Sequence, residues 1–148
     1  MPVRSRRGRV LLAAASALYL AVLASLTLGP QPETVGGTLV TLGDWFGAWE
    51  GTAWLTFAVL EFVANVVLFL PLGLLWVAWV GRRRWWLATL AGLALSGAIE
   101  ATQALALPAR YPDVRDLIAN TLGAALGAAV VAGADRIGRP PRGPRRGR

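Results

Sequence analysis

The sequence predicts an all-α integral membrane protein, a four-helix transmembrane bundle with both termini in the cytoplasm. Hydrophobic residues make up 55% of the 148 residues and charged residues only 16%, a low charge content for a soluble domain. Four apolar stretches approach or exceed the roughly 18–20 residues that a spanning helix requires. They are residues 10–28, 54–80, 85–107 and 114–134. The placement of the arginines then gives the orientation.

Arginine supplies all 15 basic side chains, and all but two of them fall into three segments. These are the N-terminal tail (1–9), the loop at 81–84 and the C-terminal tail (135–148). Because Arg-rich segments stay in the cytoplasm, both tails and this loop are expected inside, with residues 10–134 as the membrane domain. The last tail is rich in Arg, Pro and Gly. We expect a disordered topological anchor that touches anionic lipid, and no nucleic-acid partner.

The first apolar segment, residues 10–28, is either a retained anchor or a secretory signal peptide. It is longer than the roughly 7–15 apolar residues of a signal peptide, and no A-x-A cleavage site follows, so the anchor is favoured. The connection after it, residues 29–53, carries Trp45, Phe46 and Trp49 at helical spacing. Either a short interfacial helix lies in the headgroup layer there, or an irregular loop carries aromatic anchors. The sequence leaves both alternatives open.

Each of the other three apolar segments carries one stripe of polar side chains, spaced so that they share a helix face. The stripes are Glu61 with Asn65 in the second segment, Ser96 with Glu100 and Gln103 in the third, and Asp116 with Asn120 in the fourth. With a rise of about 1.5 Å per residue, all three stripes fall in the outer half of the bilayer.

A charged side chain at mid-bilayer costs at least about 2.5–3.5 kcal/mol on insertion scales. We therefore expect the stripes to face one another and external water, which would form an outward-facing polar cavity. For the amides of Asn65, Gln103 and Asn120 alone, ordinary hydrogen bonding between helices is the favoured interpretation. For Glu61 and Glu100 a functional role is favoured, because ionisable groups inside a membrane are usually functional.

The loop before the fourth segment adds Asp113 and Arg110 to the candidate ligand-binding residues. Arg110 could be the counter-ion of the carboxylates or could bind an anionic group such as a phosphate. The chain has neither His nor Cys, which excludes an imidazole base, disulfides and thiolate metal sites. No cofactor and no metal site is predicted.

Small residues indicate where helices approach closely. Gly123 and Gly127 form a GxxxG face in the fourth segment, and Gly92 belongs to a ridge of small residues in the third. Pro71 removes one backbone donor and leaves the carbonyl of Val67 without its helical partner. A kink below the polar pair of the second segment is therefore expected.

Three patches of the sequence resemble VanZ-like membrane proteins, a family connected with resistance to the antibiotic teicoplanin. They are N-x-x-L-F-x-P-x-G at 65–73, S-x-x-I-E-x-x-Q at 96–103 and R-x-x-D-x-x-D-x-x-x-N-T-x-G-x-x-x-G at 110–127. The resemblance implies a small multi-pass domain of the bacterial plasma membrane. It maps the polar motif positions onto Glu61, Asn65, Glu100, Gln103, Arg110, Asp113, Asp116 and Asn120. Gly73 and Pro71 belong to the first patch and have structural roles.

Three functions compete. The favoured one is an envelope protein that binds or modulates a lipid-linked or cell-wall-related anionic ligand, and that contributes to glycopeptide resistance. A membrane enzyme with paired carboxylates as general acid and base is the first alternative. A small proton-coupled transporter is the second, although the polar stripes do not continue toward the cytoplasm.

Overall fold

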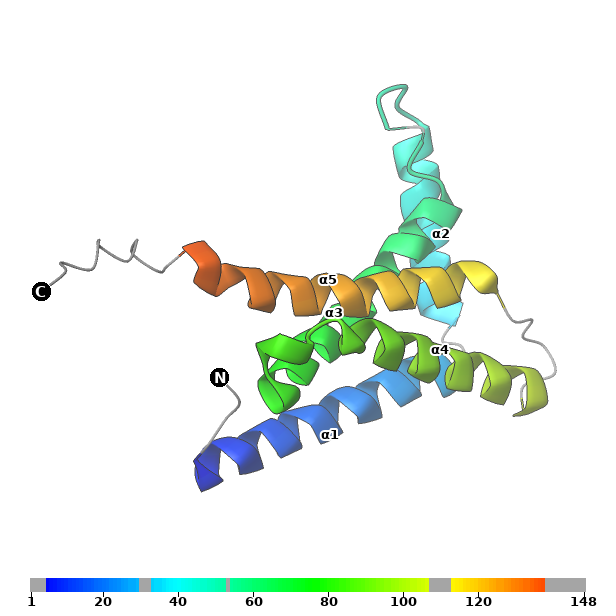
Figure 1. Ribbon diagram of the computed structural model, residues 1–148. Coiled ribbons are helices and arrows are strands. Elements are labelled where there is room, and N and C mark those ends of the chain that lie inside the picture. The colour runs from blue at the N-terminus through cyan, green and yellow to red at the C-terminus, as the bar shows by residue number, and fades with distance from the viewer. Residues whose placement is uncertain (1–4, 30–32, 53, 107–112, 138–148) are drawn as a thin grey trace, which may run out of the picture.

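The computed structural model describes residues 5–29, 33–52, 54–106 and 113–137, and these residues are all-helical (Figure 1). Their five α-helices and one 3₁₀-helix are α1 (Arg6–Leu28), α2 (Glu33–Gly47), α3 (Phe57–Val80), η1 (Arg82–Arg84), α4 (Leu87–Ala106) and α5 (Val114–Ile137). By length and composition, α1, α3 and α5 could each cross a membrane. The 20-residue α4 does not reach the same apolarity, because Glu100, Gln103 and several Ser and Thr residues interrupt it.

The four long helices α1, α3, α4 and α5 run alongside one another, and α2 stands across them (Figure 1). The first turn of α1, the short η1 and the last turn of α5 lie at one end of the bundle. The last turn of α4 and the first turn of α5 lie at the opposite end, which we call the polar end. Except for Arg115 in the first turn of α5, the arginine-bearing segments of the described chain therefore lie at the end away from the polar end.

The helix bounds differ from the predicted segments mainly in α1. This helix begins at Arg6, because the Ser5 hydroxyl caps it by accepting a 3.0 Å hydrogen bond from the backbone N–H of Gly8. Arg6, Arg7 and Arg9 are therefore helical, although the sequence assigns them to a tail. The helix predicted as one alternative for the first connection is present as α2, which contains Trp45 and Phe46, while Trp49 follows in a turn.

The closest helix contact joins α3 to α5 through glycines. A Cβ added at Gly123 or Gly127 of α5 would overlap the backbone carbonyl oxygens of Val66 and Leu70 in α3. In return, a Cβ at Gly73 of α3 would overlap the carbonyl of Ala124. The backbones can approach this closely only because no side chains separate them.

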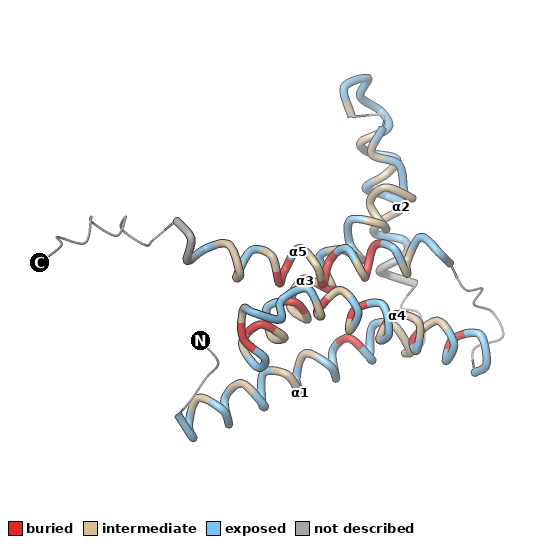
Figure 2. The backbone as a smooth tube through the Cα atoms, in the orientation of Figure 1, coloured by how far each residue is buried: buried red, intermediate tan, exposed pale blue. Residues whose placement is uncertain are grey.

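Apolar side chains fill the space between the remaining helices. Leu23, Phe69 and Ile99 form one buried cluster shared by α1, α3 and α4. Figure 2 shows the buried positions on the facing sides of α3, α4 and α5, whereas α1 is mostly exposed. The helix α3 continues through Pro71 to Val80. A rigid three-helix core thus carries the polar side chains, and α1 lies beside it.

Candidate polar site

Asn65 and Asp116 connect α3 to α5 at the polar end. The Asn65 side-chain amide donates a 2.7 Å hydrogen bond to Asp116 Oδ1, and both residues are half-buried. Asn65 directly precedes Val66, whose carbonyl oxygen faces Gly123, so the close packing of α3 and α5 fixes the distance between the two side chains. Two of the three predicted polar stripes therefore meet in the structure.

Glu100 of α4 reaches the start of α5. Its Oε2 accepts a 3.0 Å hydrogen bond from the backbone N–H of Asp113, the residue that precedes α5. Asp113 in turn caps α5, since its Oδ1 accepts a 2.7 Å hydrogen bond from the backbone N–H of Arg115. Glu100, from the polar stripe of the third apolar segment, therefore lies at the same end of α5 as Asn65 and Asp116.

Glu61 interacts electrostatically with the charged side chains at the start of α5. Within the described ranges, its half-buried carboxylate has no hydrogen-bond partner. The charged groups that act on it are Asp116, Asp113 and Arg115. The Arg115 guanidinium also donates a 3.2 Å hydrogen bond to the backbone carbonyl of Ala58, which holds this cation near the first turn of α3.

Ser96 and Asn120 form a second polar contact one helical turn deeper. The Asn120 amide donates a 2.9 Å hydrogen bond to Ser96 Oγ, and the two residues are 4% and 0% exposed. In the described part of the chain, Asn120 Oδ1 is buried and has no partner. This pair joins α4 to α5 directly below the carboxylates.

Gln103 contacts a different helix from the other candidate residues. Its side-chain amide donates a 2.8 Å hydrogen bond to the backbone carbonyl of Thr27, near the end of α1. It is buried, and it links α4 to α1 rather than to α5. Arg110 lies outside the described residues.

The cluster contains four carboxylates, Glu61, Glu100, Asp113 and Asp116, together with one arginine, Arg115. Carboxylates accept hydrogen bonds from hydroxyl, amide and amine groups. Among the residues that the structure describes, no group of three or more His, Cys, Asp or Glu is arranged to hold a metal ion. The carboxylates at this end can therefore accept hydrogen bonds from donor groups of a ligand.

Sequence reasoning missed two kinds of participants. The backbone carbonyls of Ala58 and Thr27 accept side-chain hydrogen bonds, and no sequence pattern marks a carbonyl for this role. The capping role of Asp113 had a usable signal, because Asp directly before an apolar helical segment is a preferred N-cap.

These features define a class of protein: an all-helical membrane protein in which apolar helices bring acidic and amide side chains together at one end. The profile of the VanZ/LLP1 family matches residues 16–134, which includes most of α1 and all of α2, α3 and α4. The chain belongs to the VanZ/LLP1 family, as the three sequence patches predict. Comparison with curated proteins gives no match, and comparison with solved structures gives none either.

Proposed function

We propose that this chain is a multi-pass protein of the bacterial plasma membrane whose polar end opens to the outside. There it binds the head group of a lipid-linked or cell-wall-related anionic ligand. The four long helices span the membrane with both termini in the cytoplasm. The gathering of the arginine-bearing turns at the opposite end supports this orientation, because basic segments are retained inside.

The carboxylate of Glu61, which accepts no hydrogen bond from the described residues, is the observation that carries the binding proposal. Most polar groups around it are used to join helices, whereas Glu61 has no hydrogen-bond partner in the described residues. A carboxylate within a membrane-spanning segment is costly, so its presence in this position favours a role toward a ligand. Its oxygens would accept hydrogen bonds from hydroxyl or amide groups of the ligand, beside Glu100 and Asp116.

The anionic part of the ligand needs a cation. In this proposal Arg110 makes that contact, since a guanidinium binds phosphate or carboxylate through two parallel hydrogen bonds. Contribution to resistance against teicoplanin-type antibiotics would then follow from binding an envelope component that the antibiotic needs or resembles.

Replacement of Glu61 tests the proposal. Glu61→Gln keeps the size of the side chain, so we expect the folded bundle to persist while binding of a radiolabelled lipid-linked cell-wall precursor to the protein in nanodiscs is lost. Glu50→Gln is the matched control, because Glu50 is exposed in the turn after α2. Unchanged precursor binding by Glu61→Gln would contradict the proposal, and chemical turnover of the precursor would identify an enzyme instead.

A further inference from the structure

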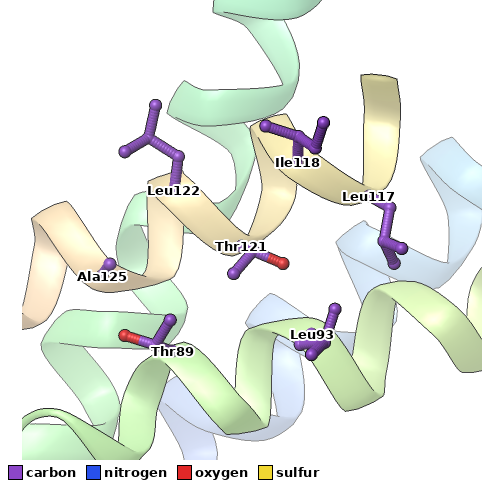
Figure 3. A pocket seen from close by; sticks show the side chains of 7 residues that line it. All are labelled: Thr89, Leu93, Leu117, Ile118, Thr121, Leu122 and Ala125. Atoms are coloured by element: carbon purple, nitrogen blue, oxygen red, sulfur yellow. The ribbon is translucent and has the colours of Figure 1, made fainter. Parts of the chain in front are cut away.

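A groove runs between α4 and α5 immediately below the polar site. It has a volume of about 360 Å³ and is lined by Thr89, Leu93, Leu117, Ile118, Thr121, Leu122 and Ala125. Figure 3 shows Leu117 and Thr121 extending from α5 toward α4, with Thr89 and Leu93 on the facing side. The lining is almost entirely apolar.

The groove faces the surroundings of the bundle rather than its core. Leu93, Ile118 and Leu122 are 43%, 55% and 41% exposed. They lie on α4 and on α5, and α5 is itself long and apolar enough to cross a membrane. At this depth the surroundings are hydrocarbon, so the occupant must be apolar.

The dimensions of the groove favour a hydrocarbon chain over a helix. From Leu117 to Ala125 it follows α5 for about 12 Å, at a rise of 1.5 Å per residue. A volume of about 360 Å³ over that length gives a mean cross-section of about 30 Å². A helix with side chains is about 10–12 Å in diameter and would need a much wider channel.

The groove also continues directly from the polar site. Leu117, at its upper end, follows Asp116, which holds Asn65. On the other wall, Leu93 lies two turns before Glu100 on the same helix. A molecule with a polar head among the carboxylates would therefore place a chain attached to that head at the mouth of the groove.

We propose that the groove between α4 and α5 holds one hydrocarbon chain of the lipid-linked ligand whose head group lies at the polar site. The inference rests on the proposed function for the identity of the head group, and on the groove alone for the chain. According to this inference the ligand is a lipid whose head group and hydrocarbon chain are both bound by the protein. A soluble cell-wall fragment, which has no such chain, is then excluded as the complete ligand.

Photo-crosslinking of the full chain in vesicles tests this inference. The probe is phosphatidylglycerol with a diazirine in one acyl chain, mixed into phosphatidylethanolamine vesicles. We expect the label on the peptides that carry Leu93 and Leu117–Leu122. Ala125→Phe should lower this labelling severalfold, because the phenyl ring fills the groove. Val130→Phe is the control, since Val130 is an exposed apolar residue of the same helix outside the groove.

A second variant distinguishes a filled groove from misfolding of the first variant. Thr89→Leu fills the groove from α4 and should also lower the labelling. Labelling that is spread evenly over the exposed apolar surface, or that both filling variants leave unchanged, would overturn the inference. So would a change in oligomeric state with Ala125→Phe, because a second copy would then be the occupant. The two proposals can fail separately. If the groove is labelled as expected but Glu61→Gln keeps full precursor binding, the head-group proposal is wrong and the chain site in the groove still stands.

Discussion

The helices α1 and α5 are both apolar enough to cross a membrane, yet they pack in very different ways. In the apolar window of α5, 33% of the residues are buried, against 6% for α1. Both helices carry small residues at four-residue spacing. In α1 these are Ala13, Ala17 and Ala21, all of them exposed, whereas Gly123 and Gly127 of α5 are buried against α3.

This difference shows that insertion of a helix into the membrane and packing of that helix against its neighbours are two separate properties, which a hydropathy pattern does not distinguish. Hydropathy predicts that a helix enters the membrane, but says nothing of what it packs against there. In hydrocarbon no hydrophobic force drives helices together, so close packing and hydrogen bonds decide the partner. The helix α5 has both, since its glycines meet Gly73 of α3 and its polar face meets Asn65 and Ser96. The helix α1 has hydrogen bonds to α3 and α4 through Ser16, Tyr19 and Thr27, but its exposed alanines make no comparable close contact.

The largest expected effect comes from closing the glycine contact. Gly127→Ala places a methyl group onto the carbonyl oxygen of Leu70, and a backbone atom cannot move aside as a flexible side chain can. We expect the free energy of unfolding to fall by about 1–3 kcal/mol, the usual cost of overpacking. Thermal unfolding in detergent, followed by circular dichroism, measures this loss.

Gly97→Ala is the matched control for that substitution. Gly97 also lies inside a helix, but nothing is within 4 Å of the added Cβ. Alanine is a better helix former than glycine by about 0.8–1.0 kcal/mol, so this variant should be neutral or more stable. Equal losses in the two variants would show that the loss does not come from the contact between α3 and α5.

The hydrogen bond from Asn65 to Asp116 should contribute less than the glycine contact. Interhelical hydrogen bonds in a membrane protein average about 0.6 kcal/mol and reach about 1.7 kcal/mol. A double-mutant cycle with Asn65→Ala and Asp116→Ala should give a coupling energy in this range, measured by unfolding in detergent. A coupling energy of zero would mean that this hydrogen bond does not help to hold α3 and α5 in register.

The sequence predicts much of this arrangement because helical spacing is local information. The pairs Glu61–Asn65 and Asp116–Asn120 share helix faces by spacing alone, and the cost of burying carboxylates predicts that such faces turn inward. The structure brings Asn65 to Asp116 and Glu100 to the start of α5, as the inward orientation requires. The family was likewise predicted from three short patches and is confirmed.

Other features depend on the three-dimensional arrangement and were not predictable in this way. The groove between α4 and α5 exists because Leu93 and Leu117 come from helices whose separation no local pattern specifies. From the sequence, the segment 114–134 is the weakest candidate span of the four, because Arg115 and Asp116 lie at its start. In the structure it qualifies as a span, while α4, with polar residues at its centre, does not. Gln103 shares a face with Glu100 by spacing, yet its contact is with α1.

The smallest effect is expected where Gln103 holds α1. Gln103→Leu removes the hydrogen bond to the Thr27 carbonyl but keeps an apolar side chain in the buried position, so the loss should be about 0.6 kcal/mol. The other side-chain hydrogen bonds between α1 and α3 involve Ser16 and Tyr19, farther from the end of α1. This loss should therefore appear as local opening of the last turns of α1, an increase of about threefold in amide exchange near Thr27. The core of α3 and α5 should exchange as before. Thr102→Val is the control, since among the described residues the Thr102 hydroxyl donates its hydrogen bond to Ala98 within its own helix. Faster exchange throughout α3 and α5 would show that α1 is an integral part of the core, and the contrast between α1 and α5 would no longer hold.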